Sequence, residues 1–200
     1  MIKISLLKFY FITFILSISL CSVGNTENEF PLDPAITYGK LENGFTYYIR
    51  ENQTPKDKVS IKLIIKAGSI MEEENQLGLA HLLEHMAFNG SKNFPKRKID
   101  EYMSSIGLNL GSHYNATTGF LETSYVYEIP TKNDKDVEIA LKILTDISKN
   151  LSFEPEAFER ERKIVEEEWR RDIGGTQDYV NEFHKVLFKN SRLNERKPIG

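Results

Sequence analysis

The run His81-Leu82-Leu83-Glu84-His85 combines the side chains that metal-dependent hydrolysis requires. Two histidines four positions apart project from one face of a helix, as a tetrahedral zinc ion requires of ligands from one element. Glu84 falls on the same side, where its carboxylate would accept a proton from a zinc-bound water. The run therefore predicts a zinc site with ligands His81 and His85 and base Glu84. The alternative is a surface pair of histidines beside a glutamate, without metal.

A catalytic zinc site needs a third protein ligand from elsewhere in the chain. The stretch 155–171 has helical periodicity, and its apolar residues gather on one side: Ala157, Phe158, Ile164, Val165 and Trp169. Of its six glutamates, only Glu161 and Glu168 share that side. Carboxylates on an apolar face are costly without charged partners. Bound Zn²⁺ is one such partner, and salt bridges to Arg162 or Arg171 are the alternative.

These residues resemble the inverted-motif zinc peptidases of the pitrilysin/insulinase family. The resemblance rests on the His-x-x-Glu-His motif, on the segment 86–95 that follows it, and on 161–170. It implies that Glu168 is the third zinc ligand and that Glu161 is a catalytic carboxylate behind the ligands, with one Zn²⁺ per catalytic half. His113 and His184 are not expected to bind the metal.

The resemblance also implies how a substrate is held. Asn115, Ala116 and Thr117 would lie on an edge strand beside the zinc, where a peptide substrate adds as a further strand through backbone hydrogen bonds. In this family a six-stranded α+β unit is duplicated, and the two halves enclose the substrate. This chain is then the N-terminal catalytic half, and it lacks the homologous C-terminal half or partner subunit.

The activity that the resemblance implies is that of a zinc-dependent endopeptidase acting on peptides or unfolded protein segments. The alternative is a non-catalytic peptide-binding subunit, since the family includes members that keep the fold and lose the site. The intact His-x-x-Glu-His motif favours the enzyme. A purely structural zinc site would need a fourth protein ligand, and the sequence suggests none.

Hydrophobic periodicity predicts the elements that must position these residues. It indicates strands at 45–50, 59–65 and 123–129, and helices at 77–88, 95–106, 137–151, 155–171 and 178–189. In the first helix it places four apolar residues on a buried side opposite the histidines: Leu79, Leu82, Leu83 and Met86. The mixture without strict alternation favours an α+β fold, with a mixed, mostly antiparallel sheet and helices packed on one face.

The composition excludes some classes of function. The 200 residues are 40% hydrophobic and carry a net charge of −3 with the two signs interspersed, so no basic footprint for nucleic acid is present. Cys21 is the single cysteine, which excludes an intramolecular disulfide and a cysteine-based zinc site.

The N-terminal region has the pattern of a targeting segment. Residues 1–23 combine lysines, a short apolar run and small residues, which is typical of a signal peptide and predicts export to the periplasm or the medium. If uncleaved, the segment would associate with a membrane as an anchor. We expect residues 24–35 to form a linker and 36–200 the zinc-binding catalytic domain, a fragment of a longer chain.

Overall fold

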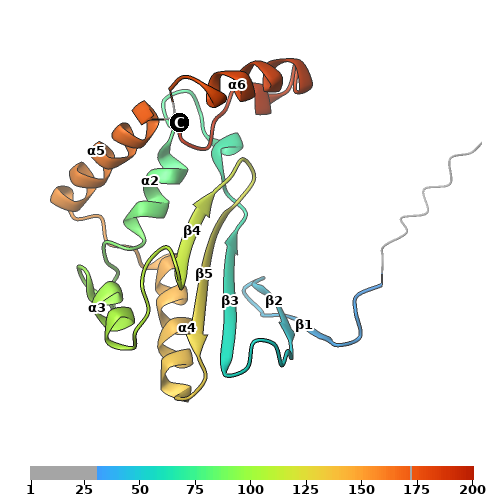
Figure 1. Ribbon diagram of the computed structural model, residues 1–200, viewed down its shortest axis with the longest axis vertical. Helices are drawn as coiled ribbons and strands as arrows, with labels where there is room; N and C mark the ends of the chain where they lie inside the picture. Colours follow the sequence, from blue (N-terminus) through green and yellow to red (C-terminus); the bar gives the residue numbers. More distant parts are fainter. Residues whose placement is uncertain (1–30, 172) are drawn as a thin grey trace, which may run out of the picture. The chain divides into compact units, whose positions relative to one another are not determined.

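The computed structural model describes residues 31–171 and 173–200, which divide into two compact units at Gln53 (Figure 1). In the first unit, β1 (Ile36–Lys40) pairs antiparallel with β2 (Thr46–Arg50), so that Ile36 lies opposite Arg50. The connecting turn contains Gly44 with a φ of 87°, a left-handed conformation that favours glycine.

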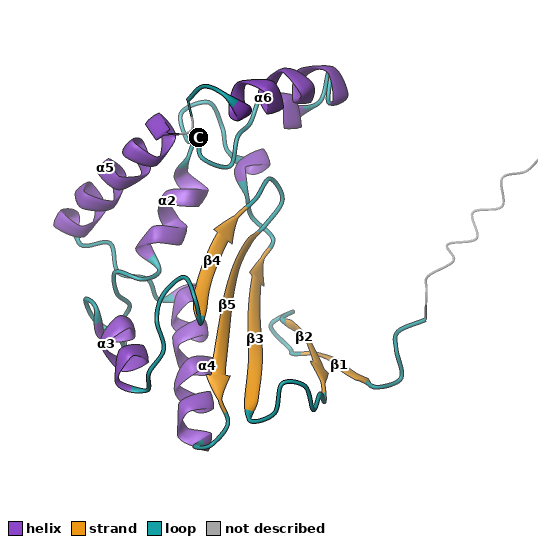
Figure 2. Ribbon diagram, viewed as in Figure 1, coloured by secondary structure: helices purple, strands orange, loops and turns teal. Residues whose placement is uncertain are grey.

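The second unit is built on an antiparallel sheet in the order β3-β5-β4 (Figure 2). Its strands are β3 (Lys58–Ile65), β4 (Tyr114–Thr118) and β5 (Thr123–Pro130). Alternation in each strand places one set of side chains on the face that the helices cover. The register aligns these residues in rows across the sheet, for example Ile61 opposite Tyr127 and Tyr127 opposite Tyr114.

Helices α3 and α4 close the core on that face. In α4 (Asp134–Lys149) the apolar residues recur at helical spacing, and the Asn133 side chain caps the first turn by accepting from the Lys135 N–H at 3.2 Å. Helix α3 (Lys98–Ser105) adds two fully buried residues, Ile99 and Met103. The fully buried core also includes Tyr127, Ile129, Ala140 and Ile143.

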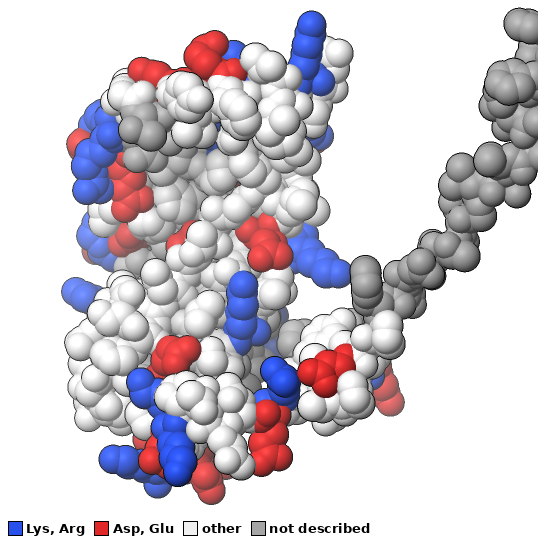
Figure 3. Space-filling model, turned by 45° about the vertical axis from the view of Figure 1, so that its right-hand side comes forward, with Lys and Arg blue, Asp and Glu red and all other residues white. Residues whose placement is uncertain are grey.

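The remaining helices lie toward one end of the sheet (Figure 1). Helix α2 (Leu79–Met86) packs against β4 and against α5 (Pro155–Arg171), and α6 (Thr176–Leu187) follows. Two short 3₁₀ turns complete the unit, at Ser69–Met71 and Arg192–Asn194. On the face drawn in Figure 3, basic and acidic side chains are interspersed, as they are along the sequence.

The N-terminus of α2 is capped by a residue from outside the helix. The preceding Gly78 has a φ of 80° and offers no side chain to the free N–H groups of the first turn. The buried Glu72 carboxylate accepts from the N–H groups of Gly78 at 3.0 Å and Ala80 at 2.8 Å. The Glu72 carbonyl in turn accepts from the guanidinium groups of Arg192 and Arg196. The start of α2 is therefore fixed to two other segments.

The loop after α2 is anchored to α4 by Asp146, which is 2% exposed. Its carboxylate accepts from the Ser91 hydroxyl at 2.7 Å, from the backbone and side-chain N–H groups of Asn93 at 2.8 Å, and from the Asn150 amide at 2.9 Å. Burial alone would raise the pKa of Asp146, but these hydrogen bonds stabilise the charged form and hold the pKa below its ordinary value of 3.8.

The predicted α+β class, the antiparallel pairing and the helices on one face are confirmed. The helix expected at 155–171 has those bounds, and the other predicted elements are present with ends that differ by a few residues. Strand β1 was not predicted, because Gly39 and Lys40 interrupt any apolar alternation. The described residues form five strands in two sheets, whereas the resemblance implied six in one unit.

One expectation about burial is wrong, and two apolar residues of α5 are more exposed than the face they share would suggest. Leu79 is 37% exposed, although Leu82 and Met86 are buried as predicted. Ile164 and Trp169 are 39% and 45% exposed, because α5 packs against α2 along a narrower stripe than its apolar residues span.

The predicted signal peptide, residues 1–23, lies outside the described residues, as does most of the expected linker. Within the described part of the chain, no helix combines the length and the apolar character needed to cross a bilayer.

We predict that Asp146→Asn lowers the free energy of unfolding by about 1–3 kcal/mol at pH 7, because the amide presents N–H groups to partners that donate. The folded-state pKa lies below the unfolded one, so the stabilisation is complete above pH ~3.8 and is lost as the pH falls through the folded value. Thermal unfolding at pH 7 and pH 3 measures this, with the exposed Glu138→Gln on the same helix as the control. A gap between wild type and variant that does not narrow at pH 3 would contradict the assignment.

Candidate metal centre

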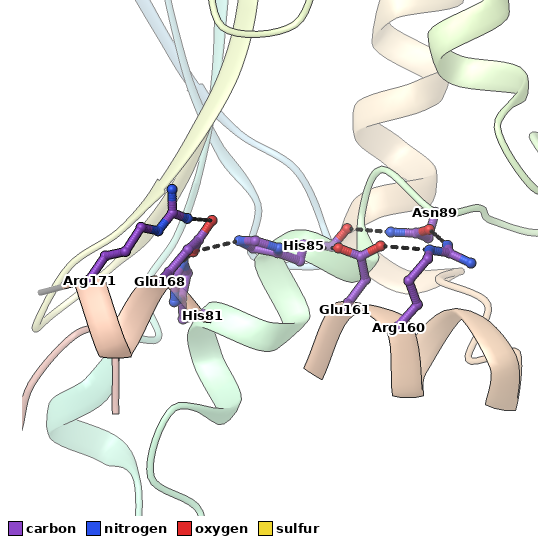
Figure 4. A network of polar contacts seen from close by, with 7 residues as sticks. All are labelled: His81, His85, Asn89, Arg160, Glu161, Glu168 and Arg171. Carbon is purple, nitrogen blue, oxygen red and sulfur yellow. Dashed lines mark hydrogen bonds and ion pairs between the residues drawn. The ribbon is translucent and has the colours of Figure 1, made fainter. Parts of the chain in front are cut away.

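Helices α2 and α5 bring together two imidazoles and one carboxylate (Figure 4). His81 and His85 project from the same side of α2, with ring centroids 4.8 Å apart and rings perpendicular. Glu168 reaches them from α5, and its Oε2 lies 3.6 Å from His81 Nε2 and 3.5 Å from His85 Nε2. These three residues form the cluster with metal-binding geometry in the described part of the chain. From the sequence, the spacing of the motif indicated His81 and His85, helical phase left Glu161 and Glu168 as candidates for the third ligand, and the family resemblance implied Glu168.

The spacing of these atoms distinguishes a metal site from a hydrogen-bonded group. Nitrogen–oxygen hydrogen bonds measure about 2.7–3.2 Å, shorter than both separations to Glu168. Ligands held at 2.0–2.1 Å by a tetrahedral ion lie about 3.3 Å from one another. Separations of 3.5 and 3.6 Å are close to this value. The Glu168 oxygen therefore lies at the separation expected of zinc ligands from both nitrogens, and these three residues could hold a zinc ion.

Glu161 lies behind His85. Its Oε2 is 3.3 Å from His85 Nδ1, which leaves Nε2 as the nitrogen that faces Glu168. A carboxylate in this position accepts the second ring N–H, fixes the tautomer and raises the basicity of the ligand nitrogen. Arg160 contacts Glu161 Oε1 at 3.3 Å and also binds the Asn89 side chain, which donates to the His85 carbonyl at 3.1 Å. The network joins the end of α2 to α5 (Figure 4).

The neighbouring residues Glu166 and Glu167 of α5 take no part in the cluster of His81, His85 and Glu168. Glu166 and Glu167 have side chains 44% and 63% exposed and pair with arginines on their own helix, Arg162 and Arg170. Sequence analysis gave salt bridges to Arg162 or Arg171 as the alternative to a metal ion. Arg162 instead binds Glu159 and Glu166. Arg171 reaches Glu168 Oε1 at 3.9 Å, which leaves Oε2 directed at the histidines.

Glu84 turns toward the sheet and is 8% exposed. Its Oε2 accepts a hydrogen bond of 2.6 Å from the hydroxyl of Thr118 on β4, a contact that sequence analysis did not predict. Burial first, and the negative charge of Glu84 second, raise the pKa of the Tyr125 phenol, so this neighbour stays protonated. Glu84 is thus joined to the sheet by a hydrogen bond.

The expected substrate segment lies on β4. Asn115 and Thr117 are exposed, whereas Ala116 points to the covered face and packs against the core. Strand β4 pairs with β5 on one side and ends the described three-stranded sheet on the other, so it is an edge strand there. Such an edge offers backbone N–H and C=O groups to an added strand.

His113 and His184 take no part in the cluster. His113 accepts from the Asn109 N–H at 3.2 Å in the turn before β4. His184 lies between Phe120 and Phe188, with ring centroids 6.0 and 5.3 Å away. A pocket of about 390 Å³ opens between α2 and α5 near Leu79 and Trp169, and none of the three candidate ligands lines it.

Comparison with known protein families matches residues 47–195 to insulinase (peptidase family M16). The chain is 37% identical over 191 residues to the probable zinc protease PqqL of Haemophilus influenzae, an alignment that covers 94% of this chain and 21% of that protein. It is 36% identical over 170 residues to the probable zinc protease PqqL of Escherichia coli, covering 85% and 18%. The chain therefore spans about a fifth of the length of the curated relatives it matches.

Solved structures have the same architecture. The first half of the periplasmic protease PqqL from Escherichia coli superimposes with a TM-score of 0.82 and 36% identity, covering 85% of this chain and 36% of that one. A mutant of the ferredoxin protease FusC, in complex with Arabidopsis ferredoxin, gives a TM-score of 0.75 and 32% identity, covering 82% and 18%.

We predict that Glu168→Gln lowers zinc affinity by more than about 100-fold. Replacing a residue that only hydrogen-bonds to a metal ligand lowers metal affinity by about 10–100-fold, and the loss of a ligand itself should cost more. The matched control is Glu167→Gln, one residue earlier and exposed. Zinc titration of the full-length variants against a competing chelator measures both. Full zinc affinity in Glu168→Gln together with a loss in Glu167→Gln would show that the helix register is wrong.

Proposed function

Because this chain belongs to the insulinase family of peptidases (peptidase family M16), we propose that it is the zinc-binding half of an endopeptidase that hydrolyses peptides or unfolded protein segments. The observation that carries the proposal is the meeting of His81, His85 and Glu168 at the separations of ligands around a tetrahedral ion.

The electrostatics of the site support a bound cation. Glu161 and Glu168 place two carboxylates against the two imidazoles, and Glu84, on the same helix as the imidazoles, is buried as Glu161 is. Buried carboxylates require a charged or hydrogen-bonded partner. Arg160 and Arg171 are themselves mostly solvent-exposed. A divalent ion held by His81, His85 and Glu168 would add positive charge among these carboxylates.

Each residue then has a defined role. Zn²⁺, when bound, supplies a Lewis acid that polarises the scissile carbonyl and acidifies a water molecule. Glu84 accepts the proton of the attacking water and delivers it to the leaving amine. Glu161 orients His85 through Nδ1. Asn115, Ala116 and Thr117 on β4 hold the substrate as an added strand through backbone hydrogen bonds.

The protein that carries this segment is proposed to have a second half and to be exported. Coverage of about a fifth of each curated relative supports a longer enzyme in which another half completes the substrate enclosure. The similar PqqL of Escherichia coli is described as a periplasmic protease, which agrees with the signal-peptide pattern of residues 1–23. The alternative, a non-catalytic binding subunit, is not favoured, because ligands and base are all present.

We predict that Glu84→Gln keeps the fold and most of the zinc but lowers kcat by about two to four orders of magnitude, because the amide cannot accept the proton. Peptide-cleavage kinetics and zinc content of the full-length variant measure this. Comparable activity would remove Glu84 from the mechanism and point to another carboxylate, Glu161 first.

We also predict that residues 22–200 alone bind zinc but cleave peptides poorly. Ligands, base and edge strand all lie within this segment, whereas orienting the scissile bond can contribute up to ~7–11 kcal/mol of barrier reduction. We assign part of that orientation to the second half. Cleavage of unstructured peptides by purified residues 22–200 at the rate of the full-length protein would refute the proposal that the chain is half an enzyme.

A further inference from the structure

We propose that Thr118 is a positioning residue for the catalytic base, and that its hydroxyl aims the Glu84 carboxylate from the strand that receives the substrate. The inference rests on the proposed function, because it concerns the role of Glu84 in peptide hydrolysis. It assigns a task to a residue that lies outside both the zinc-binding motif and the substrate segment at 115–117.

The position of Thr118 follows from the strand register. Side chains alternate along β4, so Thr118 shares the helix-covered face with Ala116 and Tyr114, while Asn115 and Thr117 face the other way. In the antiparallel pairing Thr118 lies opposite Thr123 on β5. Helix α2 packs on this face against β4, and Glu84 is the residue of α2 that meets the end of the strand.

The contact between them is short and directional. The Thr118 hydroxyl donates to Glu84 Oε2 over 2.6 Å, which lies in the range of a hydrogen bond to a charged oxygen. Glu84 is 8% exposed, so little water competes for this interaction. A carboxylate has two oxygens, and occupation of Oε2 by a donor leaves Oε1 to accept the proton of the attacking water. The hydroxyl thereby restricts rotation of the carboxylate about its last bond.

A hydroxyl at this point also couples the base to the substrate. The substrate strand is expected to pair with β4, and the register of that pairing sets where the scissile bond lies. Because Thr118 continues the same strand, one rigid element determines both the position of the bond and the direction of Glu84. Geometry held in this way lowers the barrier by orientation rather than by binding.

A purely structural role for Thr118 makes a different prediction. Threonine favours strands for its branched side chain, and valine fills the same space without a hydroxyl. If packing were the only role, Thr118→Val would be tolerated and Thr118→Ser, which loses the methyl group, would be the worse substitution. If the hydroxyl positions the base, the order is reversed.

The experiment compares Thr118→Val, Thr118→Ser and a control in the full-length enzyme, with kcat, KM and zinc content measured on an unstructured peptide. We expect Thr118→Val to lower kcat by about 10- to 100-fold, a fraction of what a general base contributes, with KM and zinc unchanged. Thr118→Ser should retain most of the activity. The control is Thr123→Val, the partner across the strand pair, whose hydroxyl donates to the Ala67 carbonyl at 2.9 Å and not to Glu84.

The outcomes separate this inference from the proposed function. If Glu84→Gln abolishes cleavage while Thr118→Val keeps full kcat, the positioning role falls and the peptidase assignment stands. A loss of kcat in Thr118→Ser as large as in Thr118→Val, or a loss in Thr123→Val of equal size, also overturns the role. If Glu84→Gln retains activity, the assignment of the base itself fails. In the Glu84→Gln background, Thr118→Val should produce no further loss, since no base remains to be aimed.

Discussion

The packing of α2 against α5 is the constraint on which the site depends. Neither helix carries a complete ligand set, because α2 provides two imidazoles and α5 provides the carboxylate. His85 joins the helices twice, through Nε2 toward Glu168 and through Nδ1 toward Glu161. A rotation of α5 by one residue, about 100°, would turn both carboxylates away from the imidazoles. The helix interface and the candidate metal centre are therefore formed by the same contacts.

Contacts outside the two helices hold α2 in place. Glu72 caps its first turn, and its carbonyl is bound by Arg192 and Arg196 from the far end of the described chain. After α2, the loop pairs with the connection between α4 and α5, since Lys92 donates to the Asn150 carbonyl and Ser152 donates to that of Gly90. These two backbone hydrogen bonds thus join the loop after α2 to the segment that leads into α5. A site held on rigid elements keeps the sub-ångström placement that catalysis requires.

Sequence analysis predicted the elements that have a periodic pattern and missed contacts made by single side chains. The 17-residue helix α5 has enough turns for its phase to separate Glu161 and Glu168 from four outward glutamates, and β3 alternates over eight residues. Thr118 reaches Glu84, 34 residues away, through a single hydrogen bond, and Glu72 caps α2 through two hydrogen bonds from outside the helix; isolated contacts of this kind leave no period to detect. Strand β1 was missed for a related reason, because its five residues include a glycine and a lysine and are too few to show an alternation of apolar and polar side chains.

The exposure of two apolar residues shows how α5 packs. Its stripe toward α2 consists of Glu161, Val165 and Glu168, at intervals of four and three residues, and the apolar Ile164 and Trp169 flank that stripe with substantial exposure. Two of the three residues that a helix normally uses for apolar packing are here carboxylates. A stripe of this kind contributes little hydrophobic stabilisation to the helix pair, and without a cation it would bring negative charges together in a partly desolvated space. Under the proposed zinc coordination, the bound cation would also stabilise the contact between α2 and α5 that creates its site.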